Sequence, residues 1–306
     1  MHSENNDVEL SVVVPILNEE KNLNELFERL SKTLINLNIS YEIIFCDNLS
    51  KDNSRKLIKR FVLENKNKVT GVFLSKNFGH QSNLRSGISL ARGKVLVTLD
   101  GDLQDPPELI EKLYHEYKNS LGKENFEIIN AKRSKRHGES ALRMFLIKSF
   151  YILCRLFITK NIQYNVGDYR LMTKKVYSII NMQKNYNLFL RSFINEIGFA
   201  KKTIVYERQP RIKEKSKMSF YYLLKDGINA IVSSSNRLLR LIPISSIFFL
   251  FTLIVLNLIF NISLILNLII MFIVLFFFIS ILSEYIANVY NELKGKKPFI
   301  IDEIIK

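Results

Sequence analysis

A long stretch without charge most constrains what this chain can fold into. No Asp, Glu, Lys or Arg occurs between Leu241 and Ser283. As a helix rising about 1.5 Å per residue, this stretch would be roughly 65 Å long. The hydrocarbon core of a bilayer is about 30 Å thick and takes about 20 helical residues, so two spans fit better than one. The sequence therefore predicts two transmembrane helices within residues 242–286, joined near Asn261.

Basic residues flank this hydrophobic segment on both sides and are missing from the expected turn. Arg237 and Arg240 precede the first span, and three lysines between residues 294 and 297 follow the second. Because short cytoplasmic flanks collect Lys and Arg, both ends of the hairpin are expected in the cytoplasm. The polar N-terminus has no signal-peptide pattern. We therefore expect an integral protein of the plasma or inner membrane, with both termini, including a tail at residues 287–306, in the cytoplasm.

Apolar strands alternate with amphipathic helices through residues 8–131. The segments between the strands carry apolar residues at helical spacing, and Pro107 suits the start of the fourth helix. Alternation of this kind predicts an α/β fold, with a mostly parallel sheet covered by helices and a ligand at the carboxyl ends of its strands. The expected strands are residues 11–15, 41–46, 69–74, 94–99 and 126–131.

The following region, residues 132–218, is less regular and more basic, and we assign it to the same domain, residues 1–218. Two amphipathic segments, about 141–158 and 219–241, are expected to lie in the membrane interface because the spans follow closely. Ordinary core helices are the alternative. The net charge of +15 requires an anionic partner. With a membrane anchor expected, a lipid surface and phosphorylated substrates are favoured, and no nucleic-acid partner is expected.

Two carboxylates, Asp100 and Asp102, follow the fourth expected strand. In extended backbone, side chains two positions apart point the same way. Carboxylates so placed can hold a hard divalent cation such as Mg²⁺ or Mn²⁺. Such a cation would neutralise charge on a leaving diphosphate. An Asp-Gly-Asp sequence alone is more typical of a polar turn, but its position after a strand and the motifs around it favour a metal site.

Four motifs follow one another along the chain: VVVPILNEE (12–20), EIIFCDN (42–48), LSKNFGHQSNLRSG (74–87) and TLDGDLQDPPE (98–108). In this order and spacing they resemble glycosyltransferase family 2, whose GT-A fold is Rossmann-like with a mostly parallel sheet. The later motifs resemble the polyprenyl-phosphate glycosyltransferases, the group of dolichyl-phosphate mannose synthase and bacterial GtrB-type enzymes. These motifs are VGDYRLM (166–172), NLFLRSF (187–193) and SEYIANVYNELKG (283–295).

The resemblance implies a metal-dependent hexosyltransferase that uses Mg²⁺ or Mn²⁺ and inverts the anomeric centre. Its donor would be a UDP- or GDP-linked nucleotide sugar. Its acceptor would be a polyprenyl phosphate, undecaprenyl or dolichyl, at the cytoplasmic membrane face, for a cell-envelope glycan. A homo-oligomer is compatible with this group, and the sugar stays open.

The resemblance also implies a role for individual residues. The donor nucleotide sugar would contact Pro15, Asn18, Glu19, Asp47, Asn48, Lys76, Asp100, Gly101, Asp102, Arg211 and Lys217. The metal would be held by Asp100, Asp102 and Gln104. The acceptor phosphate would be bound by Arg133, Arg143 and Ser216, since the guanidinium fork suits phosphate oxygens. A basic face for anionic lipids is the alternative interpretation of the cationic residues.

Asp168, in the VGDYR motif, would lie nearest the reacting acceptor. A phosphate monoester has a second pKa near about 6 and is mostly ionised at neutral pH, so it needs little help to lose a proton. Orienting or electrostatic work therefore suits Asp168 as readily as general-base work. A structural carboxylate paired with Arg170 is the alternative.

Two other functions fit parts of the sequence. A processive polysaccharide synthase shares the N-terminal motifs but carries a Gln-x-x-Arg-Trp motif, and this chain has no tryptophan. A membrane-anchored scaffold with a decayed site is suggested by Asn48, where the family has aspartate. The carboxylates Asp100, Asp102 and Asp168 argue against decay, so the glycosyltransferase is the leading hypothesis.

Overall fold

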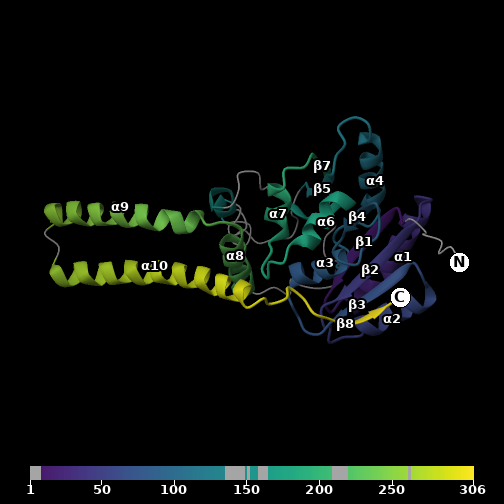
Figure 1. The fold of residues 1–306 in the computed structure, drawn as a ribbon, viewed down its shortest axis with the longest axis horizontal. Helices are drawn as coiled ribbons and strands as arrows, with labels where there is room; N and C mark the ends of the chain where they lie inside the picture. Colours follow the sequence, from purple (N-terminus) through teal and green to yellow (C-terminus); the bar gives the residue numbers. More distant parts are fainter. Residues whose placement is uncertain (1–7, 135–148, 150–151, 158–164, 209–219, 261–262) are drawn as a thin grey trace.

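A computed structural model describes residues 8–134, 149, 152–157, 165–208, 220–260 and 263–306. It shows an α/β domain and a helical hairpin that extends away from it (Figure 1). The predicted division into an α/β fold and a C-terminal helical hairpin is confirmed. Of the expected interfacial helix 141–158, residues 152–157 are helical, and most of the remainder lies outside the described residues.

One mixed sheet of eight strands organises the described part of the α/β domain, in the order β7-β5-β6-β4-β1-β2-β3-β8. Strand β1 pairs in parallel with β2 and β4, β2 with β3, and β5 with β7. Strand β6 is antiparallel to β4 and β5, and β8 is antiparallel to β3. The strands are β1 (Leu10–Ile16), β2 (Tyr41–Asp47), β3 (Val69–Leu74), β4 (Val95–Thr98), β5 (Ile128–Arg133), β6 (Val166–Thr173), β7 (Lys201–Tyr206) and β8 (Ile301–Ile305).

Helices cover both faces of this sheet, so the central strands are continuous apolar runs. On one face Val12 and Val14 of β1 share a core with Leu23, and on the other Val13 packs with Leu84. The first core includes α1 (Glu20–Asn36), α2 (Ser54–Glu64) and α4 (Leu109–Ser120). The second includes α3 (His80–Ile88), α6 (Lys174–Met182) and α7 (Leu190–Glu196).

The five predicted strands are present, with ends shifted by at most two residues. Strand β6 was not predicted, although its motif was noted. Asp168 and Arg170 interrupt its apolar pattern, yet all eight of its residues are buried. Because β6 runs antiparallel between β4 and β5, the sheet is less uniformly parallel than the alternation of strands and helices suggested.

The segment 287–306, expected as a tail, ends in a strand of the α/β domain. Strand β8 pairs along β3, opposite Gly71 to Leu74. Glu303 of β8 accepts hydrogen bonds from Arg55 at 2.7 Å and Lys59 at 3.0 Å. Strand β8 therefore belongs to the α/β domain and not to a separate tail, because the chain returns to the sheet after the hairpin.

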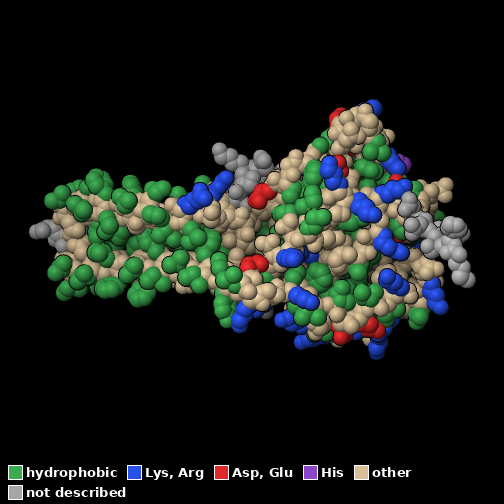
Figure 2. Space-filling view, in the orientation of Figure 1, with side chains coloured by type: hydrophobic (Ala, Val, Ile, Leu, Met, Phe, Trp, Pro, Cys, Tyr) green, Lys and Arg blue, Asp and Glu red, His purple; other side chains and the backbone are tan. Residues whose placement is uncertain are grey.

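Two helices of the hairpin, α9 (Arg237–Phe260) and α10 (Leu264–Leu293), are long and apolar enough to cross a membrane. Apolar side chains cover them, while Lys and Arg gather at their base and over the α/β domain (Figure 2). Leu258, for example, is 82% exposed, which suits lipid rather than water. The amide groups of Asn257 and Asn267 exchange hydrogen bonds between the two helices, at 3.1 and 2.6 Å.

The expected juxtamembrane helix 219–241 is divided into two helices. Helix α8 (Phe220–Ser234) ends before Ser235, whose hydroxyl accepts a hydrogen bond from the N–H of Arg237, the first residue of α9, at 3.1 Å. Helix α10 also continues past the expected span to Leu293, which carries its end to the α/β domain.

Candidate active site

The candidate site lies where parallel strands β1, β2 and β4 end and the antiparallel strand β6 begins. Pro15 of β1 is in register with Cys46 of β2, and Thr98, which ends β4, is opposite Arg170 of β6. The Thr98 hydroxyl donates a hydrogen bond to the carbonyl of Asp168. One edge of the sheet thus brings the motif residues after β1, β2 and β4 close to Asp168.

On the β1–β2 side, the expected nucleotide-binding residues link two loops. The Asn18 side chain accepts a hydrogen bond from the Lys51 N–H at 2.7 Å, and the Asn18 N–H donates to Ser50 Oγ at 2.9 Å. Asp47 is fully buried and accepts from the Ser50 N–H at 3.2 Å. Burial raises the pKa of Asp47, and the hydrogen bonds from Ser50 oppose the shift. These contacts fix the ends of both strands.

Asn48 uses both ends of its amide to hold the loop after β3. It donates to Asn77 Oδ1 at 2.9 Å, and its oxygen accepts from the Phe78 N–H at 2.9 Å. An aspartate could accept but not donate. Asparagine at this position is therefore explained by loop packing, which weakens the argument for a decayed site. Lys76, in the same loop, is exposed and lies 4.9 Å from the Phe78 ring centre.

Gly101 lets the Asp-Gly-Asp turn lie against the end of β1. A Cβ atom here would lie 2.5 Å from Ile16 Cδ1 and 3.3 Å from the Pro15 carbonyl oxygen. It would also lie 3.8 Å from Glu19 Cγ. An alanine would push the Ile16 side chain aside and crowd the Pro15 carbonyl, so glycine suits a turn packed beside two of the expected nucleotide-binding residues.

The two carboxylates of this turn are not in extended backbone, so that argument for their shared orientation is wrong. Strand β4 ends at Thr98, Gly101 and Asp102 form a turn, and Leu103 has a positive φ of 58°. The side chains of Asp100 and Asp102 are nevertheless 25% and 18% exposed and so remain accessible from outside.

Three other carboxylates lie near that of Asp100 and act on its pKa. Burial raises its pKa, and the charges of Asp105, Asp102 and Asp168 raise it further, against the opposing effect of His80. The expected third ligand, Gln104, donates its backbone N–H to Asp102 Oδ1 at 3.2 Å. Within the described residues, no three His, Cys, Asp or Glu side chains form a metal-binding group.

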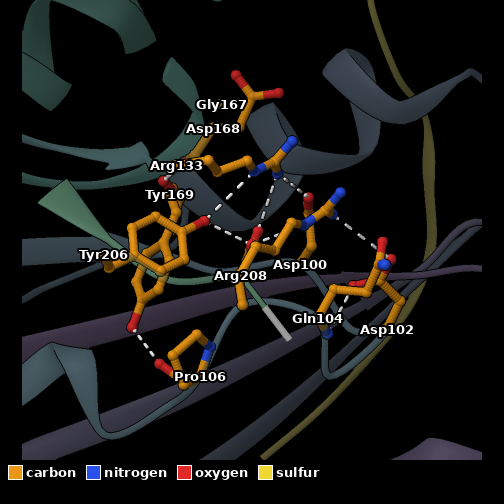
Figure 3. A network of polar contacts seen from close by, with 12 residues as sticks. Asp100, Asp102, Gln104, Pro106, Arg133, Gly167, Asp168, Tyr169, Tyr206 and Arg208 are labelled. Atoms are coloured by element: carbon orange, nitrogen blue, oxygen red, sulfur yellow. Dashed lines mark hydrogen bonds and ion pairs between the residues drawn. The ribbon is translucent and has the colours of Figure 1, made fainter. Parts of the chain in front are cut away.

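Arg133, Arg208 and Tyr206 lie close together beside Asp100 (Figure 3). Their common partner is Asp105, a fully buried carboxylate that sequence reasoning missed. It accepts hydrogen bonds from Arg133 Nη2 at 3.0 Å, Arg208 Nε at 3.0 Å and the Tyr206 hydroxyl at 2.5 Å. Burial alone would raise the pKa of Asp105, but the two guanidinium groups hold it below its usual value. One carboxylate therefore orients two arginines from β5 and from the residues after β7.

Both arginines also face the Asp-Gly-Asp turn. Arg133 Nη2 lies 4.0 Å from Asp100 Oδ2, and Arg208 Nη2 lies 3.9 Å from Asp102 Oδ2. Burial alone would lower the pKa of Arg133, but the nearby Asp105 raises it above its usual value, so Arg133 stays charged. A Cβ at position 167 would lie 3.0 Å from Arg133 Nη2, so Gly167 leaves room for the guanidinium.

Asp168 is 3% exposed and surrounded by donors. Arg191 Nη2 lies 2.7 Å from Oδ2 and Arg191 Nε lies 3.1 Å from Oδ1. Gln81 Nε2 donates to Oδ2 at 3.2 Å, while Arg170 Nη2 is more distant, 3.5 Å from Oδ1. Burial would raise the pKa of Asp168, but Arg191 and His80 hold it well below its usual value. The group is therefore a weak base held as an anion.

His80, at the start of α3, connects the two groups of carboxylates. Its Nε2 atom lies 3.4 Å from Asp168 Oδ2 and 3.6 Å from Asp100 Oδ1. Burial alone would lower the pKa of His80, but both carboxylates raise it. His80 stands within the noted LSKNFGHQSNLRSG motif, residues 74–87.

The remaining expected residues lie outside the described part of the chain: Arg143, Arg211, Ser216 and Lys217. The structure adds two arginines, Arg191 and Arg208, to which sequence analysis assigned no role. Arg191 stands in the noted NLFLRSF motif, which was the available signal. Arg208 follows β7, whose existence was not predicted.

Comparison with known proteins gives a consistent assignment. The model of glycosyl transferase family 2 matches residues 11–180, more than half of the chain. An uncharacterized glycosyltransferase of Synechocystis sp. is 31% identical over 97% of this chain and 96% of its own length. The undecaprenyl-phosphate 4-deoxy-4-formamido-L-arabinose transferase of Proteus mirabilis is 29% identical over 97% of this chain and 94% of its own length. A prophage-derived bactoprenol glucosyl transferase of Shigella flexneri is 28% identical, over 96% and 97% respectively.

A solved structure shares the fold of the catalytic part. Mannosyl-3-phosphoglycerate synthase from Rubrobacter xylanophilus superposes with a TM-score of 0.51 at 14% identity, covering 76% of this chain and 74% of its own. The mostly parallel mixed sheet is thus the GT-A fold that the motifs indicated. With its sheet, its motifs and this family match in agreement, the chain belongs to glycosyl transferase family 2.

Proposed function

We propose that this protein transfers a single sugar, with inversion, from a UDP- or GDP-linked donor to a polyprenyl phosphate at the cytoplasmic membrane face. The observation that carries the proposal is the placement of Asp168. It lies within 3.4 Å of His80, which itself lies 3.6 Å from Asp100 in the expected diphosphate-binding turn. The donor diphosphate, near Asp100, and the acceptor phosphate, near Asp168, would thus lie on either side of His80. The relatives named for undecaprenyl phosphate and bactoprenol support the lipid class.

In the proposed reaction the acceptor phosphate attacks the sugar carbon while the donor diphosphate leaves. The attacking phosphate is mostly ionised at neutral pH, so it requires no strong base. Asp168, held as an anion by Arg191, is suited to orient the acceptor's surroundings and to stabilise positive charge that develops on the sugar. Its lowered pKa favours this role over proton abstraction.

A divalent metal fits the Asp-Gly-Asp turn by the chemistry of its donors. Asp100 and Asp102 supply hard carboxylate oxygens, and the charge crowded around Asp100 would be relieved by a cation. Gln104 could add an amide oxygen. A bound Mg²⁺ or Mn²⁺ would neutralise negative charge on the leaving diphosphate. Arg133 and Arg208, oriented by Asp105, already point at this turn and are placed to contact phosphate oxygens.

The hairpin would bring this site to the lipid acceptor. We propose that α9 and α10 span the membrane, with residues 1–218, strand β8 and both termini in the cytoplasm. The basic residues at the hairpin base, including Arg237 and Arg240, support this orientation. A lipid phosphate at the bilayer surface would then lie at the height of the interfacial segments.

The test is transfer in membranes containing the full chain, incubated with undecaprenyl phosphate and a panel of UDP- and GDP-linked sugars. One donor should yield a glycolipid, EDTA should abolish the product, and added Mg²⁺ or Mn²⁺ should restore it. Asp100→Asn should abolish transfer. Asp302→Asn removes one negative charge in the same way, at an exposed position on β8, and should leave transfer unchanged. If no donor gives a glycolipid with the unmodified chain, the proposal fails.

A further inference from the structure

The cytoplasmic end of the membrane helix α10 makes polar contacts with the loop that joins α6 to α7, residues 183–189. Both carboxylate oxygens of Glu292 accept hydrogen bonds from the Tyr186 N–H, at 2.9 and 3.1 Å. One helical turn earlier, Asn288 Oδ1 accepts from the Asn187 side chain at 3.4 Å. Charge-assisted hydrogen bonds to a backbone N–H are stronger than neutral ones. The loop is therefore held by the membrane helix on one side.

On its other side, this loop is held by α3. Arg85, which is 5% exposed, donates to the Gln183 carbonyl at 2.6 Å and the Asn185 carbonyl at 2.7 Å. Burial lowers the pKa of Arg85 to about 10, and the Glu292 carboxylate opposes the shift. The two charged side chains thus act on one loop from opposite sides.

The loop leads directly into the active site. Its last residue precedes Leu190, whose N–H donates to Gln81 Oε1 at 3.2 Å, while the Gln81 amide nitrogen donates to Asp168. The following residue is Arg191, which supplies the guanidinium on Asp168. Because α7 is a short helix, the position of its first turn depends on the loop before it.

We infer that Glu292 is a positioning residue: a carboxylate on the membrane helix that fixes loop 183–189 and, through it, Arg191 against Asp168. The inference rests on the function proposed above and adds that the catalytic geometry depends on where α10 enters the α/β domain. Glu292 touches no reacting group, so its effect passes through the loop. Figure 1 shows the right-hand, C-terminal end of α10 beside α8 and next to the α/β domain.

The experiment compares full-length variants in detergent or in native membranes. Glu292→Ala should lower kcat roughly 10-fold, since small displacements of catalytic groups are costly. KM for the donor should stay within about 2-fold, because the donor-binding turn is untouched. Glu292→Gln retains one acceptor oxygen and should recover part of the rate. Glu284→Ala is the matched control: it also removes one glutamate from α10, at an exposed position, and it should leave kcat unchanged.

Hydrogen exchange of the peptide covering residues 183–189 supplies a structural readout. Exchange should rise in Glu292→Ala and not in Glu284→Ala, with thermal unfolding showing that both variants fold. The inference is overturned if exchange does not rise, if it rises while kcat is unchanged, or if both variants lose activity equally. A full-length unmodified protein that transfers no sugar would instead overturn the proposed function, and the exchange comparison would still decide whether Glu292 holds the loop.

Discussion

Replacing Asp168 with asparagine would separate an orienting carboxylate from a general base. The carboxylate accepts hydrogen bonds from Arg191 at 2.7 and 3.1 Å and from Gln81 at 3.2 Å. In Asp168→Asn one oxygen becomes an NH₂ group, which must face one of these donors whichever way the amide is turned. The substitution therefore removes the charge and also breaks at least one contact, while keeping the volume of the side chain.

The size of the effect follows from those contacts. A hydrogen bond to a charged group contributes about 1.5–3 kcal/mol, and the lost pairing leaves Arg191 without its anion. If most of this free energy stabilises the transition state, kcat should fall roughly 10²-fold. That corresponds to a barrier about 2.7 kcal/mol higher, at about 1.36 kcal/mol per tenfold change in rate. KM for the donor should change little, because Asp168 lies across His80 from the donor-binding turn.

The pH dependence provides the decisive assay. The pKa of folded Asp168 is well below its usual value, so its ion pair is fully formed above about pH 4 and is lost only as pH falls through that lowered pKa. The rate should instead fall below about pH 6, where the acceptor phosphate gains a proton. Asp168→Asn should therefore be slower with the same acid limb. If the acid limb disappears in the variant, Asp168 is the titrating base and the argument is refuted.

Three further changes test neighbouring parts of the site. Arg191→Lys should lower kcat about 10-fold without changing KM for the donor, because an ammonium group cannot reproduce the fork on Asp168; steady-state kinetics would show it. Gly101→Ala should raise KM for the donor about 10-fold, because the new methyl group clashes with the end of β1; nucleotide titration measures this directly. Asp105→Asn should destabilise the domain by about 3–5 kcal/mol in denaturant unfolding, because two guanidinium groups lose a buried counter-charge. Unchanged values in any of these would contradict the corresponding contact's role.

The predictable part of the fold is the part with a strong local pattern. Strands β1 to β5 are apolar runs beside helical periodicity, and the hairpin is marked by its absence of charge. Strand β6 lacked such a signal because Asp168 and Arg170 are buried polar residues, whose partners include Arg191 and the Gly167 carbonyl. Strand β8 is short and alternates between half-buried and exposed residues, and its partner β3 lies more than 200 residues away.

Prediction of the site was likewise limited to residues that a local motif marks. Asp100, Asp102 and Asp168 could be identified because motifs mark them. Asp105 stood within a quoted motif, but only the fold reveals that it is buried between two arginines from distant parts of the chain. The turn at Gly101 also depends on contact with β1 rather than on local sequence. Pairings across the sheet, and not residue types, were what sequence reasoning lacked.

Strand β8 has a consequence for how the protein is made. The edge of β3 is completed by residues that follow both apolar helices in the chain. During synthesis, the backbone groups on this edge of β3 stay unpaired until the hairpin and then residues 301–305 have left the ribosome. An open edge of this kind is prone to pairing with other chains. The sheet can therefore be completed only after both apolar helices have been synthesised, which ties the last step in folding of the α/β domain to the hairpin.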